Sequence, residues 1–175
     1  IGHHVGGLFA SVPHGSIGFK SGNLMASMDK FVIRIEGSGG HGSMPEDTVD
    51  SIVCLGDIVQ AINRIKSREI SSSEKCVISV CKVNSGINQN IIPSEAEIEG
   101  TVRTFNDDVR KYIRKRIGEI SEYYSQGNRC GVSYDYAWKY PHLANNDNII
   151  ELLKKSTRKI FSEDIIHDIE SETMA

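Results

Sequence analysis

The chain has 175 residues, a formal net charge of -3 at pH 7 and a pI near 6.1. This slightly acidic balance argues against binding to nucleic acid or to an anionic membrane surface, because both require a basic face. No apolar run approaches the length of a transmembrane helix, and no signal peptide opens the sequence. Because the chain begins without an initiator methionine, we expect a fragment of a longer protein.

The first segment of the chain carries two adjacent histidines, His3 and His4. Neighbouring side chains on an extended segment point to opposite sides, so at most one of them faces a shared site. Each is either a surface residue or a metal ligand on this argument alone. The glycine-rich stretch that follows, as far as Gly18, predicts a loop without regular structure.

A glycine-rich loop over residues 37–45 follows the first predicted strand and carries His41. Glycine at this density indicates positive φ angles or a close approach to the backbone. An imidazole on such a loop can donate to a substrate oxygen or bind a metal. The alternative is a strand-to-helix connection whose glycines serve geometry alone and whose histidine is simply solvated.

The spacing of Gly37, Gly39 and Gly42 matches the G-x-G-x-x-G pattern of dinucleotide-binding loops. We reject that interpretation because residues 45–47 separate the last glycine from the helix, so the helix N-terminus cannot lie over a pyrophosphate. The next strand also lacks a terminal acid for a ribose.

Periodicity predicts a compact unit in the middle of the chain. Apolar residues at spacings of three and four indicate helices, and alternating or β-branched runs indicate strands. In chain order these are strand 30–35, helix 49–68, strand 76–83, strand 95–105, helix 106–127 and strand 130–136, with a polar turn at 84–93. This order is that of a ferredoxin-like (βαββαβ) fold, whose exposed edge strands invite pairing with a second copy.

Two side-chain expectations accompany this pattern. The inner face of the second helix is predicted to include Tyr112, together with the isoleucines of that helix. The cysteines lie in no ligand-like pair and are predicted to be small buried hydrophobes, which favours a reducing, cytoplasmic compartment. They are Cys54, Cys76, Cys81 and Cys130.

A further helix is predicted from Asn145 through Ile160, after the ferredoxin-like unit is complete. It must pack against something else. We therefore expect segments 1–23 and 141–175 to be pieces of a different domain, into which residues 24–140 are inserted.

Several short motifs, taken together, resemble the dizinc metallopeptidases and amidohydrolases, which include aminoacylases, hippurate hydrolases, auxin-conjugate hydrolases and carboxypeptidase G type enzymes. The motifs occur in family order: Gly-His-His-Val at 2–5, Gly-Gly-His-Gly-Ser-Met-Pro at 39–45, Asn-Ile-Ile-Pro at 90–93, Gly-Thr-Val-Arg-Thr-Phe at 100–105 and Thr-Met-Ala at 173–175. The resemblance implies an α+β fold, with a ferredoxin-like lid inserted into an incomplete α/β zinc-peptidase-type catalytic domain. One departure is Glu46, which stands where a histidine is common.

The resemblance also implies roles for four residues. His4 matches a metal ligand, and His41 matches a histidine that reaches into the partner subunit and holds the oxygen of the tetrahedral intermediate. Asn90 and Arg103 match residues that grip substrate, and an arginine fork suits a carboxylate. From the residues alone, Asn90 could equally cap a turn and Arg103 could lie on a strand surface.

The function implied for the full-length protein is metal-dependent hydrolysis of N-acyl amino acids or amino-acid conjugates. Its expected cofactors are two divalent metal ions, zinc first, with manganese or cobalt as alternatives. Its expected partners are a small-molecule amide and a second copy bound through the lid, without nucleic acid or membrane. The other metal ligands and the general base lie outside the chain, so the fragment alone is expected to be inactive. The rival hypothesis is a non-catalytic ferredoxin-like dimerisation or small-molecule-binding module.

Overall fold

The computed structural model describes residues 9–174 and divides the chain into two compact units. The central unit is Met28–Tyr140, and the terminal unit combines the described residues before Met28 with those after Tyr140.

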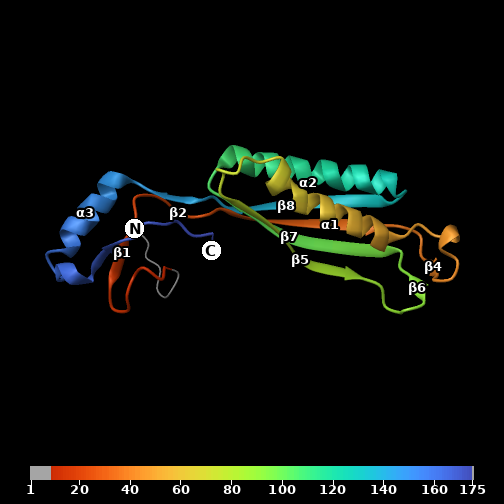
Figure 1. The fold of residues 1–175 in the computed structure, drawn as a ribbon, viewed down its shortest axis with the longest axis horizontal. Helices are drawn as coiled ribbons and strands as arrows, with labels where there is room; N and C mark the ends of the chain where they lie inside the picture. Colours follow the sequence, from red (N-terminus) through yellow and green to blue (C-terminus); the bar gives the residue numbers. More distant parts are fainter. Residues whose placement is uncertain (1–8, 175) are drawn as a thin grey trace. The chain divides into compact units, whose positions relative to one another are not determined.

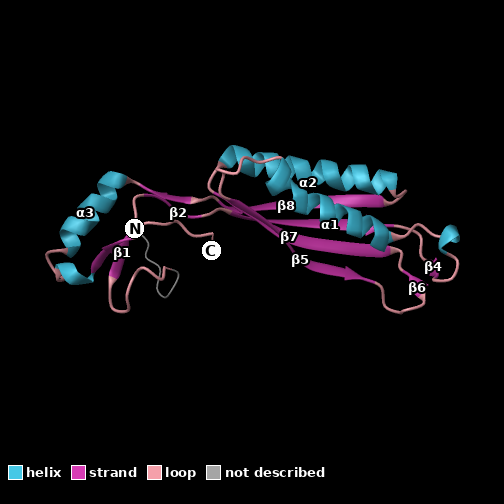
Figure 2. Ribbon diagram, in the orientation of Figure 1, coloured by secondary structure: helices cyan, strands magenta, loops and turns pink. Residues whose placement is uncertain are grey.

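The central unit is a sheet covered on one face by two helices (Figures 1 and 2). Its strands run antiparallel in the spatial order β5-β7-β3-β8, and the chain order of elements is strand, helix, strand, strand, helix, strand. The predicted α+β class is confirmed. The bounds are β3 Met28–Glu36, α1 Ser51–Arg68, β5 Cys76–Ser85, β7 Glu95–Thr104, α2 Asp107–Gly127 and β8 Gly131–Tyr140.

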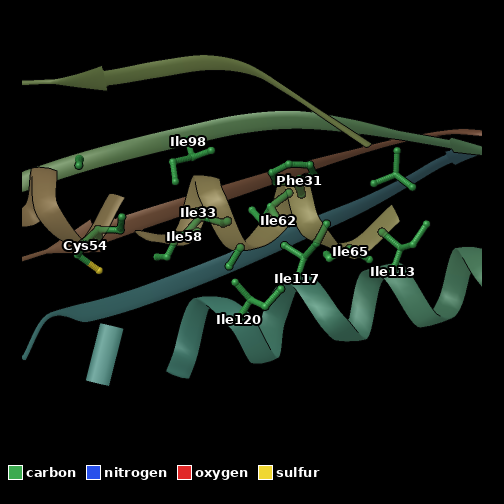
Figure 3. Close-up of a cluster of buried hydrophobic side chains, with 14 of the residues drawn as sticks. Phe31, Ile33, Cys54, Ile58, Ile62, Ile65, Ile98, Ile113, Ile117 and Ile120 are labelled. Atoms are coloured by element: carbon green, nitrogen blue, oxygen red, sulfur yellow. The ribbon is translucent and has the colours of Figure 1, made fainter. Parts of the chain in front are cut away.

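Strict alternation along the strands places the core between the sheet and the helices. On β3, Phe31, Ile33 and Ile35 are buried, and the intervening residues face the uncovered side of the sheet. Isoleucines of both helices fill the space between these residues and the helices (Figure 3). Full burial of each such side chain contributes about 1.5–3 kcal/mol. Gly100 of β7 has no room for a side chain, because a Cβ there would lie 2.2 Å from Cζ of Phe31.

Both helices of the central unit begin at a side-chain cap. Oδ1 of Asp50 accepts hydrogen bonds from the backbone N–H groups of Ile52 at 2.8 Å and Val53 at 3.3 Å. Oδ1 of Asn106 accepts in the same way from the first turn of α2. Each cap stabilises its helix by about 1 kcal/mol. The prediction that Tyr112 faces inward is wrong: it is exposed, and its hydroxyl donates at 2.7 Å to Glu69, the residue that follows α1.

The cysteine prediction holds for three positions and is wrong for Cys81, which is exposed. The pairing of β5 with β7 shifts register between Val80 and Lys82, and this bulge takes Cys81 out of the alternation. Burial raises the pKa of the Cys54 thiol to about 11, so that thiol stays protonated at neutral pH.

The terminal unit contains two pairs of short strands and one helix. Strand β1 (Ile17–Phe19) lies parallel to β10 (Ile166–Asp168), and β2 (Gly22–Met25) lies antiparallel to β9 (Leu143–Asn145). Thus β1 begins inside the stretch predicted to be irregular up to Gly18, because its edge pairs with a segment distant in sequence. Within residues 9–174, no helix is long and apolar enough to cross a membrane.

Helix α3 (Asp147–Thr157) is shorter than predicted. The sequence pattern included Ile160, but the helix ends three residues earlier and Ile160 is 78% exposed. A short 3₁₀ turn, Glu163–Ile165, follows before β10. The apolar character of Ile160 therefore did not indicate burial within this unit.

Candidate functional site

The glycine-rich loop and the turn at 84–93 meet in a small ribbon. Strands β4 (Gly40–His41) and β6 (Ile91–Ile92) pair antiparallel, with Gly40 opposite Ile92 and His41 opposite Ile91. The turn predicted at 84–93 therefore contains a short strand. This ribbon lies at the end of the central unit away from Met28 and Tyr140 (Figure 1).

Close backbone contacts explain the glycines of the loop. A Cβ on Gly39 would lie 2.6 Å from the carbonyl oxygen of Ile92, and one on Gly37 would lie 2.2 Å from that of Val49. Neither glycine has a positive φ. The glycine pattern thus serves packing within the unit. The 3₁₀ turn Pro45–Asp47 separates the loop from α1, so the N-terminus of that helix does not directly follow the glycines, unlike in a dinucleotide-binding loop.

His41 is exposed, and its ring is held at one nitrogen. Its Nδ1 accepts a hydrogen bond from the backbone N–H of Ser43 at 3.2 Å and lies 2.7 Å from Oγ of Ser43. Because a backbone N–H can only donate, Nδ1 is the acceptor and the neutral ring carries its proton on Nε2. Nε2 has no hydrogen-bond partner in the described part of the chain. The loop therefore presents an oriented N–H donor to solvent.

Asn90 lies beside His41 because the ribbon joins their segments. The carbonyl oxygen of Asn90 accepts from the backbone N–H of Gly42 at 2.8 Å, and the side chain is exposed. Within the described residues its carboxamide makes no hydrogen bond, so the turn-capping alternative gains no support. The structure brings these two candidate site residues together.

Arg103 lies at the other end of β7, paired with Val77 of β5. The distance along the strand from Glu95, near the ribbon, to Arg103 is roughly 27 Å at 3.4 Å per residue. The structure therefore does not bring Arg103 to His41 within one chain. Its Nη1 is buried and has no hydrogen-bond partner among the described residues.

The expected metal ligand His4 lies outside the described residues. Within residues 9–174, no group of three or more histidine, cysteine, aspartate or glutamate side chains could hold a metal ion. The described residues therefore do not fit the two-metal centre that the motifs imply.

An open groove of about 730 Å³ runs along the uncovered face of the sheet to the ribbon. Apolar residues line it beside the ribbon, among them Pro93 and Ile91, which stands opposite His41. Glu36 and Glu95 also line it and stand directly opposite each other in the β3–β7 register. Neither glutamate forms an ion pair with a described residue.

Reasoning from sequence missed two contributors to this site. Ser43 orients the imidazole of His41, and the His-x-Ser spacing in the sequence is the feature that could have indicated this contact. Ile91 faces His41 across the ribbon, which no local pattern could show because the pairing joins residues 50 positions apart.

Three comparisons with known proteins agree with one another. The family model described as the peptidase dimerisation domain matches residues 26–126. The chain is 38% identical over 137 residues to an N-acetylcysteine deacetylase of Bacillus subtilis, covering 78% of this chain and 35% of that protein. It is 36% identical to an N-acyl-L-amino acid amidohydrolase of Geobacillus stearothermophilus, covering 80% of this chain and 36% of the relative.

Solved structures show the same fold. One is a putative aminohydrolase of methicillin-resistant Staphylococcus aureus, with a TM-score of 0.78 and 25% identity over 92% of this chain and 42% of that one. Another, described as a dinuclear metal-binding peptidase of the M20 family from Bacillus subtilis, has a TM-score of 0.69 and 24% identity over 94% of this chain and 39% of that one. The chain thus spans well under half the length of the proteins it matches.

Proposed function

The chain belongs to the M20 family of peptidase dimerisation domains, and on that basis we propose that it supplies the dimerisation lid of a metal-dependent amidohydrolase. The substrates are N-acyl amino acids or amino-acid conjugates, in keeping with the names of its relatives. The central unit, Met28–Tyr140, forms the ferredoxin-like lid, which begins four residues after the predicted start at residue 24 because β2 pairs with β9 in the terminal unit. The segments before Met28 and after Tyr140 belong to the catalytic domain that the lid interrupts.

The observation that carries this proposal is the oriented, unpartnered Nε2–H of His41. A preformed donor aimed at solvent is suited to the oxygen that gains charge when an amide carbonyl becomes tetrahedral. Such a donor is effective because its orientation is fixed before the reaction begins, here by the backbone N–H of Ser43. The backbone of Asn90 is hydrogen-bonded to the loop that carries His41, and we assign its exposed carboxamide to the same substrate.

The length of the sheet supports action on a second copy of the chain. The chain enters the central unit at Met28 and leaves it at Tyr140, and these residues pair at one end of the sheet. His41 follows the other end of β3, a strand of nine residues that spans about 30 Å. His41 therefore lies about 30 Å along the sheet from the residues at which the chain enters and leaves the central unit, and we assign it to the active site of a second copy.

Arg103 lies near the end of the sheet at which the chain enters, since its neighbour Val102 pairs with Asp29. We assign its guanidinium to the carboxylate of the amino-acid portion of the substrate, a bidentate match. Because His41 lies at the opposite end, Arg103 and His41 of one chain belong to different active sites of the dimer. Its buried, unpaired Nη1 is the group that substrate would satisfy.

Two divalent metal ions, zinc in the first place, complete the full-length enzyme, where they would activate water and polarise the amide. The described residues provide no site for them, so the steps assigned to this chain are donation by His41 and substrate binding by Asn90 and Arg103.

Dimerisation follows from the same arrangement. The uncovered face of the sheet carries charges that pair across strands, including Lys82 with Glu99 at 2.5 Å and Arg34 with Asp135 at 2.7 Å. Because the charged side chains of this face already pair with one another, the face is better exposed to water than buried against a protein. We therefore assign the dimer contact to a sheet edge or to the helices. Sedimentation should show a homodimer for the full-length protein, and a strict monomer at high concentration would contradict this assignment.

The test is hydrolysis of N-acetyl and longer N-acyl amino acids by the full-length protein. We expect turnover that a chelator abolishes and that added metal restores, and no turnover by residues 1–175 alone. A full-length protein that binds no metal and hydrolyses none of these amides would instead be the non-catalytic module.

A further inference from the structure

We propose that Ile91 determines which acyl groups the site accepts, and that the site favours neutral, apolar acyl chains over acyl chains bearing a carboxylate. This inference rests on the proposed function, since it concerns the substrate held by His41. It adds a specificity-determining residue on the lid and a substrate class.

The register of the ribbon places Ile91 next to His41. The two residues stand directly opposite each other in the β4–β6 pair. Directly opposed residues of antiparallel strands have Cβ atoms about 4.5–5.5 Å apart and side chains on the same face. Ile91 is 47% exposed, whereas its neighbour Ile92 points to the other face and is half-buried.

The backbone holds Ile91 and His41 as one body. The N–H of Gly42 donates to the carbonyl of Asn90 at 2.8 Å, immediately before Ile91. On the other side, Gly39 fits against the carbonyl of Ile92 so closely that a Cβ would lie 2.6 Å from that oxygen. When His41 enters a site, Ile91 enters with it.

The geometry of an amide decides which part of the substrate meets Ile91. Nε2 of His41 would lie about 2.9 Å from the carbonyl oxygen that it binds. The acyl chain begins on that same carbonyl carbon, whereas the amino-acid side chain begins beyond the amide nitrogen. The acyl chain is therefore the group nearest to a residue beside His41.

The groove beyond Ile91 has the size and charge to receive a longer acyl chain. Its volume of about 730 Å³ lies within the range of roughly 300–1,000 Å³ for small-molecule sites. Ile91 and Pro93 provide apolar surface beside the ribbon. Farther along, Arg34 of the lining is neutralised by Glu97 and Asp135, whereas Glu36 and Glu95 have no ion-pair partners among residues 9–174. A carboxylate at the end of an acyl chain would meet those like charges.

The experiment measures kcat/KM of the full-length enzyme for N-acetyl, N-butanoyl, N-hexanoyl and N-succinyl derivatives of one amino acid. Wild type should prefer butanoyl to succinyl. In Ile91→Ala the ratio of hexanoyl to acetyl should fall about tenfold, because one methylene in an apolar pocket is worth at least that factor. The matched control is Val53→Ala, an apolar residue on α1 that is 54% exposed, which should leave the ratio unchanged.

Each failure has its own reading. If wild type hydrolyses none of the derivatives, the proposed function and this inference fall together. If wild type is active but Ile91→Ala keeps the wild-type ratio, only the role of Ile91 is overturned.

A second series with a constant acetyl group and varied amino acids must stay unaffected in Ile91→Ala. If that series responds instead, Ile91 faces the leaving amino acid and the acyl assignment is wrong. If succinyl is preferred to butanoyl, the assigned substrate class is wrong.

Discussion

The two ends of the central sheet each carry a polar side chain at the centre of a hydrogen-bonded cluster, and the clusters differ in one respect. At the end where the chain enters, Asp29 is fully buried and both its oxygens are satisfied. Oδ2 accepts from Nε of Arg110 at 2.7 Å and from the hydroxyl of Tyr136 at 3.0 Å. Oδ1 accepts from Nη2 of Arg110 at 2.6 Å and from the backbone N–H of Lys139 at 3.1 Å.

At the other end, His41 is exposed, and only one of its two nitrogens has a partner. In the Asp29 cluster, by contrast, Arg110 makes an additional contact, because its guanidinium lies over the ring of Trp138, 4.7 Å from the ring centroid. Burial raises the pKa of Tyr136, which therefore remains a donor. A buried carboxylate with both oxygens paired joins strands and helix, whereas an exposed imidazole with one oriented donor left over is prepared for a ligand. The comparison separates a structural role from a functional one.

The largest effect should come from breaking the closed cluster. Asp29→Asn leaves the guanidinium of Arg110 buried without its counter-charge, and we expect it to lower the free energy of unfolding by about 3–5 kcal/mol. Urea titration of the 175-residue chain measures this loss. The double variant Asp29→Leu with Arg110→Met, which removes both charges, should recover most of it. A loss below about 1 kcal/mol for Asp29→Asn would show that the cluster does not hold the unit together.

The open cluster should behave in the opposite way. In the full-length enzyme, His41→Ala removes an oxyanion donor, so kcat should fall about 10²–10³-fold while the free energy of unfolding and the metal content stay unchanged. Ser43→Ala removes only the hydroxyl contact to Nδ1 and keeps the backbone donor, so kcat should fall about two- to tenfold. Equal losses in the two variants would mean that orientation by Ser43, and not donation by His41, is what matters.

The glycine contacts offer a graded test of how the ribbon positions His41. In Gly39→Ala the new Cβ must displace the backbone of Ile92, which we expect to cost about 1–3 kcal/mol of unfolding free energy and to lower kcat as well. Gly56→Ala on α1 is the matched control, because its Cβ meets nothing within 4 Å. That variant should gain up to about 1 kcal/mol from helix propensity. A Gly39→Ala enzyme with wild-type kcat would show that the ribbon tolerates displacement.

The smallest effect is expected at acid pH, where the ion pairs between the two ends of the central sheet should lose their contribution to the free energy of unfolding. Hydrogen bonding to Lys30, and then to Lys82, lowers the pKa of Glu99 from 4.5 to about 2. A carboxylate with a depressed pKa stabilises the folded state above its unfolded pKa, and this stabilisation is lost as the pH falls from about 4.5 to about 2. In Glu99→Gln the free energy of unfolding should therefore decline less steeply across that window. If the unfolding free energy of variant and wild type changes equally with pH, these ion pairs do not stabilise the folded state.

Much of the fold could be predicted because it depends on local periodicity. The strands and helices of the central unit appear in the predicted order, and their ends differ by a few residues, as in β8, which continues to Tyr140. The errors have identifiable causes. A bulge rotated Cys81 outward, and an ion-pair network on the surface drew Tyr112 away from the core.

The site was less accessible to sequence reasoning than the fold. Residue types suggested His41, and family resemblance supplied the roles of Asn90, Arg103 and His4. The pairing of His41 with Ile91, however, joins two-residue strands that have no pattern of their own. The separation of Arg103 from the ribbon, in contrast, follows from the length of β7 alone and is contained in the predicted strand at 95–105.

The most direct test of the central claim, that His41 serves the partner's active site, is complementation in a full-length heterodimer. One subunit carries His41→Ala and the other carries His4→Ala, each inactive as a homodimer. One site of the heterodimer then combines an intact His4 with His41 from the partner subunit, so purified heterodimer should have about half of wild-type activity if the two sites act independently. If the heterodimer forms and remains inactive, His41 does not act across the dimer, and the account is wrong.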